Sequence, residues 1–146
     1  GISNSLHVIS MAFDIIGLPK EITSMQSGKI DWHDSGSQFI GCGTSENNIP
    51  FTYHADWGSS GRWGIEIFTK ENSYLLIPLE ELYVCKKFTG ITVPVEFDVA
   101  FPDLKLGIPE EIAIMLDSTS GLDLVTLEYA AKLNQITEKI MGYSSN

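Results

Sequence analysis

The chain has 146 residues, of which 43% are hydrophobic and 19% charged, values typical of one soluble globular domain with an apolar core. Its 19 acidic and 9 basic residues give a net charge of −10, which argues against nucleic acid or an anionic membrane as a partner, because phosphates would be repelled. No apolar run is long enough to cross a bilayer and no secretion signal is recognisable, so we expect a cytoplasmic protein.

The first expected element is a helix over residues 5–17, within the stretch NSLHVISMAFDIIG. A small polar side chain at position 4 or 5 can cap its start, a glycine can end it, and the proline beyond prevents continuation. His7, Ser10 and Asp14 fall on one face, while the other positions are mostly apolar. We expect a largely buried helix with one narrow polar stripe.

Seven strand-like stretches follow between Glu21 and Asp98. Turn residues such as DSGS, SENN, GSSG and EN separate them. The stretches are residues 21–33, 38–44, 49–57, 62–70, 73–79, 81–88 and 91–98. Connections this short join antiparallel neighbours, because a parallel crossover needs a dozen or more residues.

The two cysteines, Cys42 and Cys85, both fall in these strand-like stretches and lack the spacing of metal ligands. Two isolated thiols in a domain of this size are typical of a reducing compartment. We expect them to be buried, inert thiols rather than a disulfide.

Helical spacing returns after Asp98. The stretch IPEEIAIMLD, residues 108–117, opens with a proline and two acidic residues, which suit a helix N-terminus. Apolar residues recur at helical spacing over residues 122–143. No linker or repeat divides the chain, so residues 1–146 are predicted to form a single α+β domain. Its centre is an open, predominantly antiparallel sheet with the helices packed on one face.

Several of these stretches together resemble a known family. NSLHVISMAFDIIGLPKEI is similar to the helix that opens the C-terminal domain of the Gfo/Idh/MocA oxidoreductases, where the pattern is like SHxxDxxxxLxGxPxxV. HADWGSSGRWGIEIFTKENSYLLIPLEEL resembles the central hairpin of that domain. DLKLGIPEEIAIML and LDLVTLEYAAKLNQITEKI resemble its late KxGxxxQIxxFL segment and its closing helix. The four matches follow the family's order and span nearly the whole chain.

The resemblance implies the fold that the periodicity predicts, and it also implies a missing part. Family members begin with a Rossmann domain that has a GxGxxG-like turn and a catalytic lysine in an EKP-like motif. Neither occurs in this sequence, and GCGTSEN reads as strand and turn because no helix pattern follows it. We therefore expect the C-terminal, substrate-side and oligomerisation domain of an NAD- or NADP-dependent dehydrogenase acting on a sugar or sugar-derived hydroxyl. Alone it should be inactive and bind no cofactor, its partner being a Rossmann domain outside these residues.

His7 is the candidate catalytic residue. In the family, a histidine at the start of this helix reaches the reacting carbon of the substrate and takes part in proton transfer, a role that suits imidazole. The family pattern places aspartates four residues before and three after it, where this chain has Ser3 and Ser10. Two interpretations stay open: a proton-transfer residue, or a histidine at a helix N-terminus without chemistry. The serines favour the alternative function, a non-catalytic binding or assembly module.

Three further residues are assigned to substrate binding. Asn4 lies in the stretch that resembles the opening helix. Lys105 matches a family lysine at the edge of the cleft, although an ordinary solvated lysine would fit equally well. Arg62, beside Trp57 and Trp63, could bind a carboxylate or stack against a sugar. The alternative for Arg62 is aromatic packing with a charged end that reaches solvent.

A metal site made of His33, His54 and Asp56 is considered and not adopted. His54 and Asp56 share one face of a strand, but the ligand pattern of a closed zinc site is absent. Pairing of polar side chains across a wet sheet face explains these residues more simply, and no metal is expected.

The last expectation is a homo-oligomer formed through the sheet. From Gln38 to Leu79 the strands hold large apolar residues at both parities, and these must alternate between the two faces. They are Phe39, Phe51, Tyr53, Trp57, Trp63, Ile65, Ile67 and Tyr74. Helices on one face leave the other to be covered by a second copy.

Overall fold

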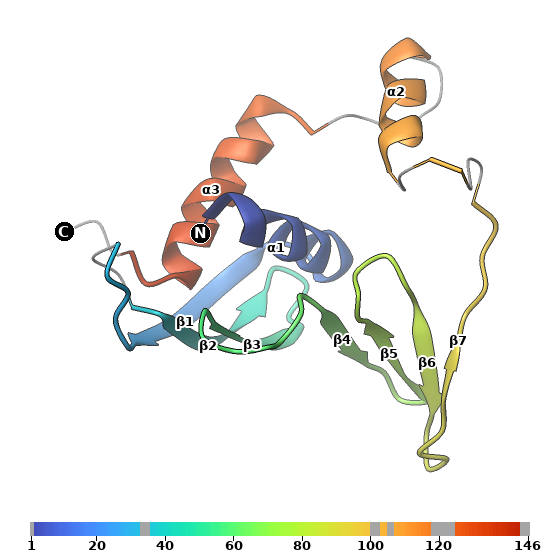
Figure 1. Cartoon of the computed structure of the whole chain (residues 1–146), viewed down its shortest axis with the longest axis horizontal. Coiled ribbons are helices and arrows are strands. Elements are labelled where there is room, and N and C mark those ends of the chain that lie inside the picture. The colour runs from blue at the N-terminus through green and yellow to red at the C-terminus, as the bar shows by residue number, and fades with distance from the viewer. Residues whose placement is uncertain (1, 33–35, 100–102, 105–106, 118–124, 144–146) are drawn as a thin grey trace. The chain divides into compact units, whose positions relative to one another are not determined.

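The computed structural model describes residues 2–32, 36–99, 103–104, 107–117 and 125–143. These residues form helices and antiparallel strands, which confirms the predicted α+β class (Figure 1). The helices are α1 (Ile2–Ile16), α2 (Ile108–Leu116) and α3 (Leu127–Ile140). The strands are β1 (Pro19–Ser27), β2 (Gln38–Ser45), β3 (Pro50–Asp56), β4 (Ile65–Phe68), β5 (Asn72–Leu76), β6 (Tyr83–Lys86) and β7 (Thr92–Pro94).

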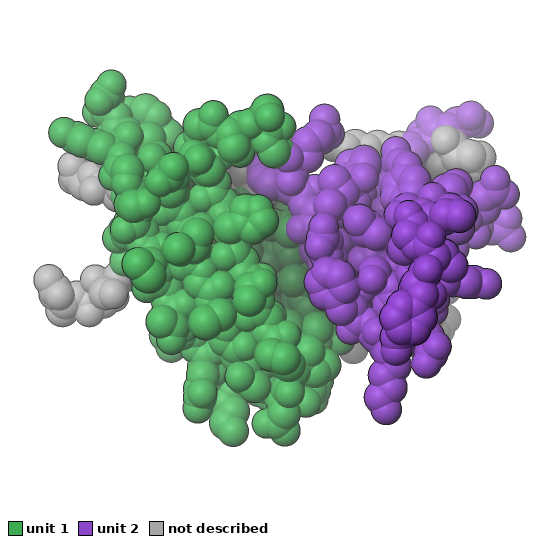
Figure 2. All heavy atoms as spheres, turned by 90° about the horizontal axis from the view of Figure 1, so that it is seen from below, with its two compact units in different colours: residues 1–61, 128–146 green, residues 62–127 purple. Residues whose placement is uncertain are grey.

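The chain divides into two compact units (Figure 2). Unit 1 comprises residues 1–61 and 128–146, and unit 2 comprises residues 62–127. The strands form two ladders, ordered β1-β2-β3 and β4-β5-β6-β7, where one sheet was predicted. The expected tight connection at GSSG between paired strands is wrong: β3 and β4 belong to different ladders, and residues 57–64 separate them.

Unit 1 has the predicted arrangement, with α1 and α3 on the same face of β1-β2-β3 (Figure 1). Phe13 of α1 is buried in one cluster with three side chains of α3, which recur at helical spacing. Those three are Leu133, Ile136 and Ile140. Phe51 of β3 meets the Phe13 ring edge-on, with centroids 5.3 Å apart. The core of unit 1 therefore combines both ends of the sequence with the sheet between them.

The central strand β2 packs closely against this core. Phe39 is only 1% exposed, and its ring meets that of Tyr143 edge-on, with centroids 6.4 Å apart. Gly43, four residues after Phe39 on the same face of β2, lies under the Phe51 ring. A Cβ atom at Gly43 would collide with the carbonyl oxygen of Glu21 and lie 2.6 Å from a ring carbon of Phe51. The glycine at this position is what lets the neighbouring strand and the ring approach so closely.

Side chains from the sheet hairpin bond to the C-terminal carbonyl groups of both helices. Asn47, in the turn between β2 and β3, donates from Nδ2 to the carbonyl oxygen of Ile16 at 3.1 Å. Tyr53 of β3 donates from its hydroxyl to the carbonyl oxygen of Ile140 at 2.9 Å. Burial raises the pKa of Tyr53 above its ordinary value. Each helix end gains a partner for a carbonyl that the helix itself leaves unpaired.

The ends of α1 agree only partly with the sequence prediction. Gly17, with φ of 87°, ends the helix as expected, and its N–H donates to the carbonyl oxygen of Phe13 at 2.8 Å. The start lies earlier than expected, at Ile2, so Asn4 and Ser5 fall within the helix and do not cap it.

Unit 2 is built around β4-β5-β6-β7. Strand register places one set of apolar side chains on a single face of this sheet. They are Ile65, Ile67, Tyr74, Leu76, Val84 and Val93. Among the described residues, by contrast, the members of the buried hydrophobic core cluster belong to unit 1, and Pro109 at the start of α2 is a buried residue of unit 2. Unit 2 therefore leaves much apolar surface in water, including Phe68, which is 74% exposed on the opposite face of the same sheet.

The two cysteines are free, in agreement with the sequence, but the prediction that they are buried is wrong. Cys42 is exposed and Cys85 partly exposed. Cys42 follows Gly41 on β2, and the alternation along the strand turns it away from the helices. Of the helices in the described residues, none combines the length and apolar character that a membrane span requires.

Candidate functional site

His7 lies on the exposed side of α1, but the prediction of a largely buried helix with one narrow polar stripe is wrong. Within residues 5–16 only Phe13 is buried, and the apolar Met11 and Ile15 are 36% and 45% exposed. Ser10, one turn after His7, donates from its hydroxyl to the backbone carbonyl oxygen of His7 at 3.1 Å. The hydroxyl is therefore bonded within the helix backbone. A serine in this state supplies neither the charge nor the carboxylate acceptor of the aspartate that the family pattern has at this position.

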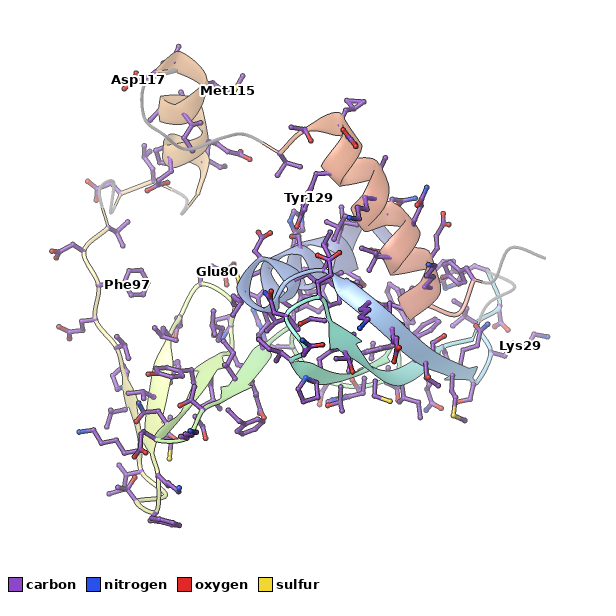
Figure 3. All side chains as sticks on the ribbon, turned by 180° about the vertical axis from the view of Figure 1, so that it is seen from behind. Lys29, Glu80, Phe97, Met115, Asp117 and Tyr129 are labelled. Carbon is purple, nitrogen blue, oxygen red and sulfur yellow. The ribbon has the colours of Figure 1, made fainter. Side chains whose placement is uncertain are left out.

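The third residue of the predicted stripe, Asp14, is joined to α3. Tyr129 donates from its hydroxyl to Oδ1 of Asp14 at 2.8 Å, and Figure 3 shows the labelled Tyr129 side chain on α3 beside α1. Burial and the neighbouring Asp14 carboxylate raise the pKa of Tyr129 to about 12. The bond links segments 115 residues apart in sequence, so it helps to hold α1 against α3.

We expect Tyr129→Phe to lower the free energy of unfolding by about 0.5–1 kcal/mol at pH 7, because one partly exposed hydrogen bond to a charged group is lost. The raised pKa means that the folded state favours the protonated phenol. The contribution of this preference to the free energy of unfolding is complete below pH ~10, the pKa of an unfolded tyrosine. It disappears as the pH rises through about 12. Urea unfolding at several pH values between 8 and 12 should show a shallower alkaline loss in the variant.

Asp14→Asn is the matched control for this prediction. The amide oxygen can still accept from the Tyr129 hydroxyl, so most of the stability at pH 7 should remain, while part of the alkaline effect should go with the charge. If the two variants lost equal stability at pH 7, the hydrogen bond would not be the cause.

The residues assigned to substrate binding lie in different parts of the chain. Asn4 belongs to α1 in unit 1, whereas Arg62 is exposed at the start of unit 2. Lys105 lies outside the described residues. The assignment of all three residues to substrate binding therefore stays a prediction.

The tryptophan next to Trp57 is Trp32, which the sequence analysis did not single out. The two indoles meet edge-on, with centroids 5.9 Å apart and planes at 90°. Both remain exposed, Trp32 by 66% and Trp57 by 46%. The strand order explains this contact and could have predicted it. β1 and β3 both flank β2 and run antiparallel to it, so the segments that follow them, with Trp32 and Trp57, leave the sheet at the same end.

Asp56 has a structural role at this end of the sheet. Its Oδ1 accepts from the backbone N–H of Gly58 at 2.8 Å, and its Oδ2 accepts from Nε2 of Gln38 at 3.1 Å. These bonds match the polar pairing that the sequence analysis preferred to a metal site. His33 lies outside the described residues, and within the described ranges no three His, Cys, Asp or Glu side chains are arranged to hold a metal ion.

An open groove of about 740 Å³ lies within unit 2. Its lining is rich in carboxylates and comprises residues 80–83 and 94–99. Tyr83 donates a short hydrogen bond to Glu81 there, and this bond with the neighbouring charge raises the pKa of Tyr83. None of the described residues assigned to catalysis or substrate binding lines this groove.

Comparison with known proteins gives one informative likeness. No protein-family model and no curated protein matches the sequence. Among solved structures, the UDP-N-acetylglucosamine 3-dehydrogenase GnnA from Acidithiobacillus ferrooxidans is similar to this chain, with a TM-score of 0.68 and 10% sequence identity. The similarity covers 94% of this chain and 44% of that one, so this chain spans less than half the length of the dehydrogenase. At this identity the likeness concerns the fold: the chain folds like part of a dehydrogenase.

Proposed function

We propose that the chain is the C-terminal, substrate-side domain of a cytoplasmic NAD(P)-dependent dehydrogenase of the Gfo/Idh/MocA type. The observation that carries the proposal is the fold likeness to a sugar-nucleotide dehydrogenase over 94% of this chain and 44% of that enzyme. The family resemblance of the sequence supports the same function independently. The substrate class would be a sugar or sugar derivative with a hydroxyl that is oxidised.

His7 is the residue to which we assign proton transfer in the whole enzyme. It is exposed on α1, and α1 is held by the core of unit 1 and by the bond between Tyr129 and Asp14. An exposed imidazole on a firmly held helix can meet a substrate that a second domain delivers. The nicotinamide cofactor, bound by that second domain, would supply the hydride chemistry.

The gene's reading frame upstream of Gly1 provides the first test. A GxGxxG-like turn after a strand, followed by an EKP-like lysine, would support a dehydrogenase. The longer protein should then bind NADH or NADPH saturably in a calorimetric titration, whereas the chain of residues 1–146 should give no saturable binding. Micromolar binding by this chain alone would place the nucleotide site here and contradict the proposal.

Within that longer protein, His7→Ala should lower kcat by about 100-fold or more, because a positioned general acid or base contributes at least this much. The matched control is His54→Ala, which removes an exposed histidine on β3. Steady-state rates of nicotinamide reduction against a panel of sugars and sugar nucleotides would measure both. A loss of less than about threefold for His7→Ala would assign this residue the purely structural role.

The competing function is a non-catalytic binding or assembly module with the same fold. The observation in its favour is Ser10, whose hydroxyl is bonded to the helix backbone where the family pattern has an aspartate. Ser10→Asp in the longer protein distinguishes the two functions. A gain in dehydrogenase activity would indicate an enzyme in which Ser10 replaces the aspartate of the family pattern. No activity in the wild type or in the variant would favour the binding or assembly module.

We also propose that the chain self-associates through a sheet face, here the apolar face of β4-β5-β6-β7. The expected alternation of the large apolar residues between two faces of one sheet is wrong: Phe39, Phe51 and Tyr53 all face the helices of unit 1. The apolar face of β4-β5-β6-β7 carries Ile65, Ile67 and Tyr74, which are partly exposed, and Val93, which is 46% exposed, and none of the described residues of unit 2 belongs to the buried hydrophobic core cluster. Each large side chain moved from water into an interface contributes on the order of 2 kcal/mol. A two-fold contact of a second copy on this face, burying at least ~1,000 Å², would cover it.

Light scattering at tens of micromolar should therefore give the mass of a dimer. Val93→Asp places a charge on the proposed face, at a side chain that is 46% exposed, and should weaken the dimer by at least about tenfold. Phe68→Asp, on the opposite face of the same sheet, is the matched control and should leave the dissociation constant unchanged. A monomeric wild type, or equal effects of the two variants, would refute the interface.

A further inference from the structure

We draw no further inference here: the strongest candidate, the open groove in unit 2 lined by Glu80, Glu81, Glu96 and Asp98, is an acidic cluster for which nothing else in the described part of the chain points to a ligand.

Discussion

Phe39→Ala is expected to lower the free energy of unfolding by about 3–5 kcal/mol. Phe39 is 1% exposed on the central strand of unit 1, so truncation loses its apolar transfer energy and leaves a cavity beside Tyr143. Strands on both sides and the helix layer above restrict how far the site can collapse. Urea unfolding followed by tryptophan fluorescence measures the change, since Trp32 and Trp57 both report on unit 1.

Ile40→Ala is the control for this prediction, because Ile40 is the next residue of β2 and faces the other way. Its side chain is 50% exposed, and truncation should cost about 1 kcal/mol or less. If Ile40→Ala destabilised the chain as much as Phe39→Ala, the outer face of β2 would be as deeply buried as the inner one, contrary to this structure.

Gly43→Ala should lower the free energy of unfolding by about 3 kcal/mol, although it adds only one methyl group. The new Cβ would collide with a backbone oxygen of β1 and with the Phe51 ring, and neither can move away cheaply. The oxygen belongs to the paired strand, and the ring is fixed against Phe13 in the core. Thermal and urea unfolding of the variant would measure the loss.

Gly58→Ala provides the matched control, a glycine to alanine change in the same unit. A Cβ at Gly58 would lie no closer than 3.3 Å to any other group, the nearest being a carboxylate oxygen of Asp56. The residue lies in an exposed turn outside the left-handed region, so the expected change is within about 0.5 kcal/mol. A large loss there would show that backbone freedom, rather than close packing, governs glycine substitutions in this unit.

The elements that sequence reasoning predicted well are those whose signals are local. The helix ending at Gly17 follows from that glycine and from the proline two residues later. The last helix was predicted within residues 122–143, and α3 occupies Leu127–Ile140 of that stretch, with Ile136 and Ile140 buried as the spacing indicates but with Leu127 88% exposed. The strands of unit 1 follow from alternation and turn residues. Each of these features is decided by neighbours within one turn of helix or one hairpin.

The division into two ladders was not predictable in the same way. Alternation and short turns indicate that consecutive strands pair, but they do not show where a sheet stops. The connection over residues 57–64 contains Gly58, Gly61 and Gly64, and its composition suits a tight hairpin as well as an open loop. Whether this segment folds as a hairpin or as an open loop depends on contacts with residues far from it in the sequence.

The candidate site was predictable only in part for a related reason. Helical spacing placed His7, Ser10 and Asp14 on one face of a helix, and that helix is present. Spacing could not show that Asp14 is bonded to Tyr129, since the two are 115 residues apart. It equally could not show that Trp57 meets Trp32, because that contact depends on the register of β1, β2 and β3.

The order of unit 1 along the chain has a consequence for how the protein folds during synthesis. Its core needs Leu133, Ile136 and Ile140, which follow the whole of unit 2 in the sequence. Until α3 leaves the ribosome, α1 and the three-stranded sheet have only part of their cover, and Phe13, Phe39 and Phe51 have no complete core to enter. Closing so long a loop makes folding slow and leaves apolar surface open to aggregation for that time. A nascent chain is therefore expected to need a chaperone until α3 has been made.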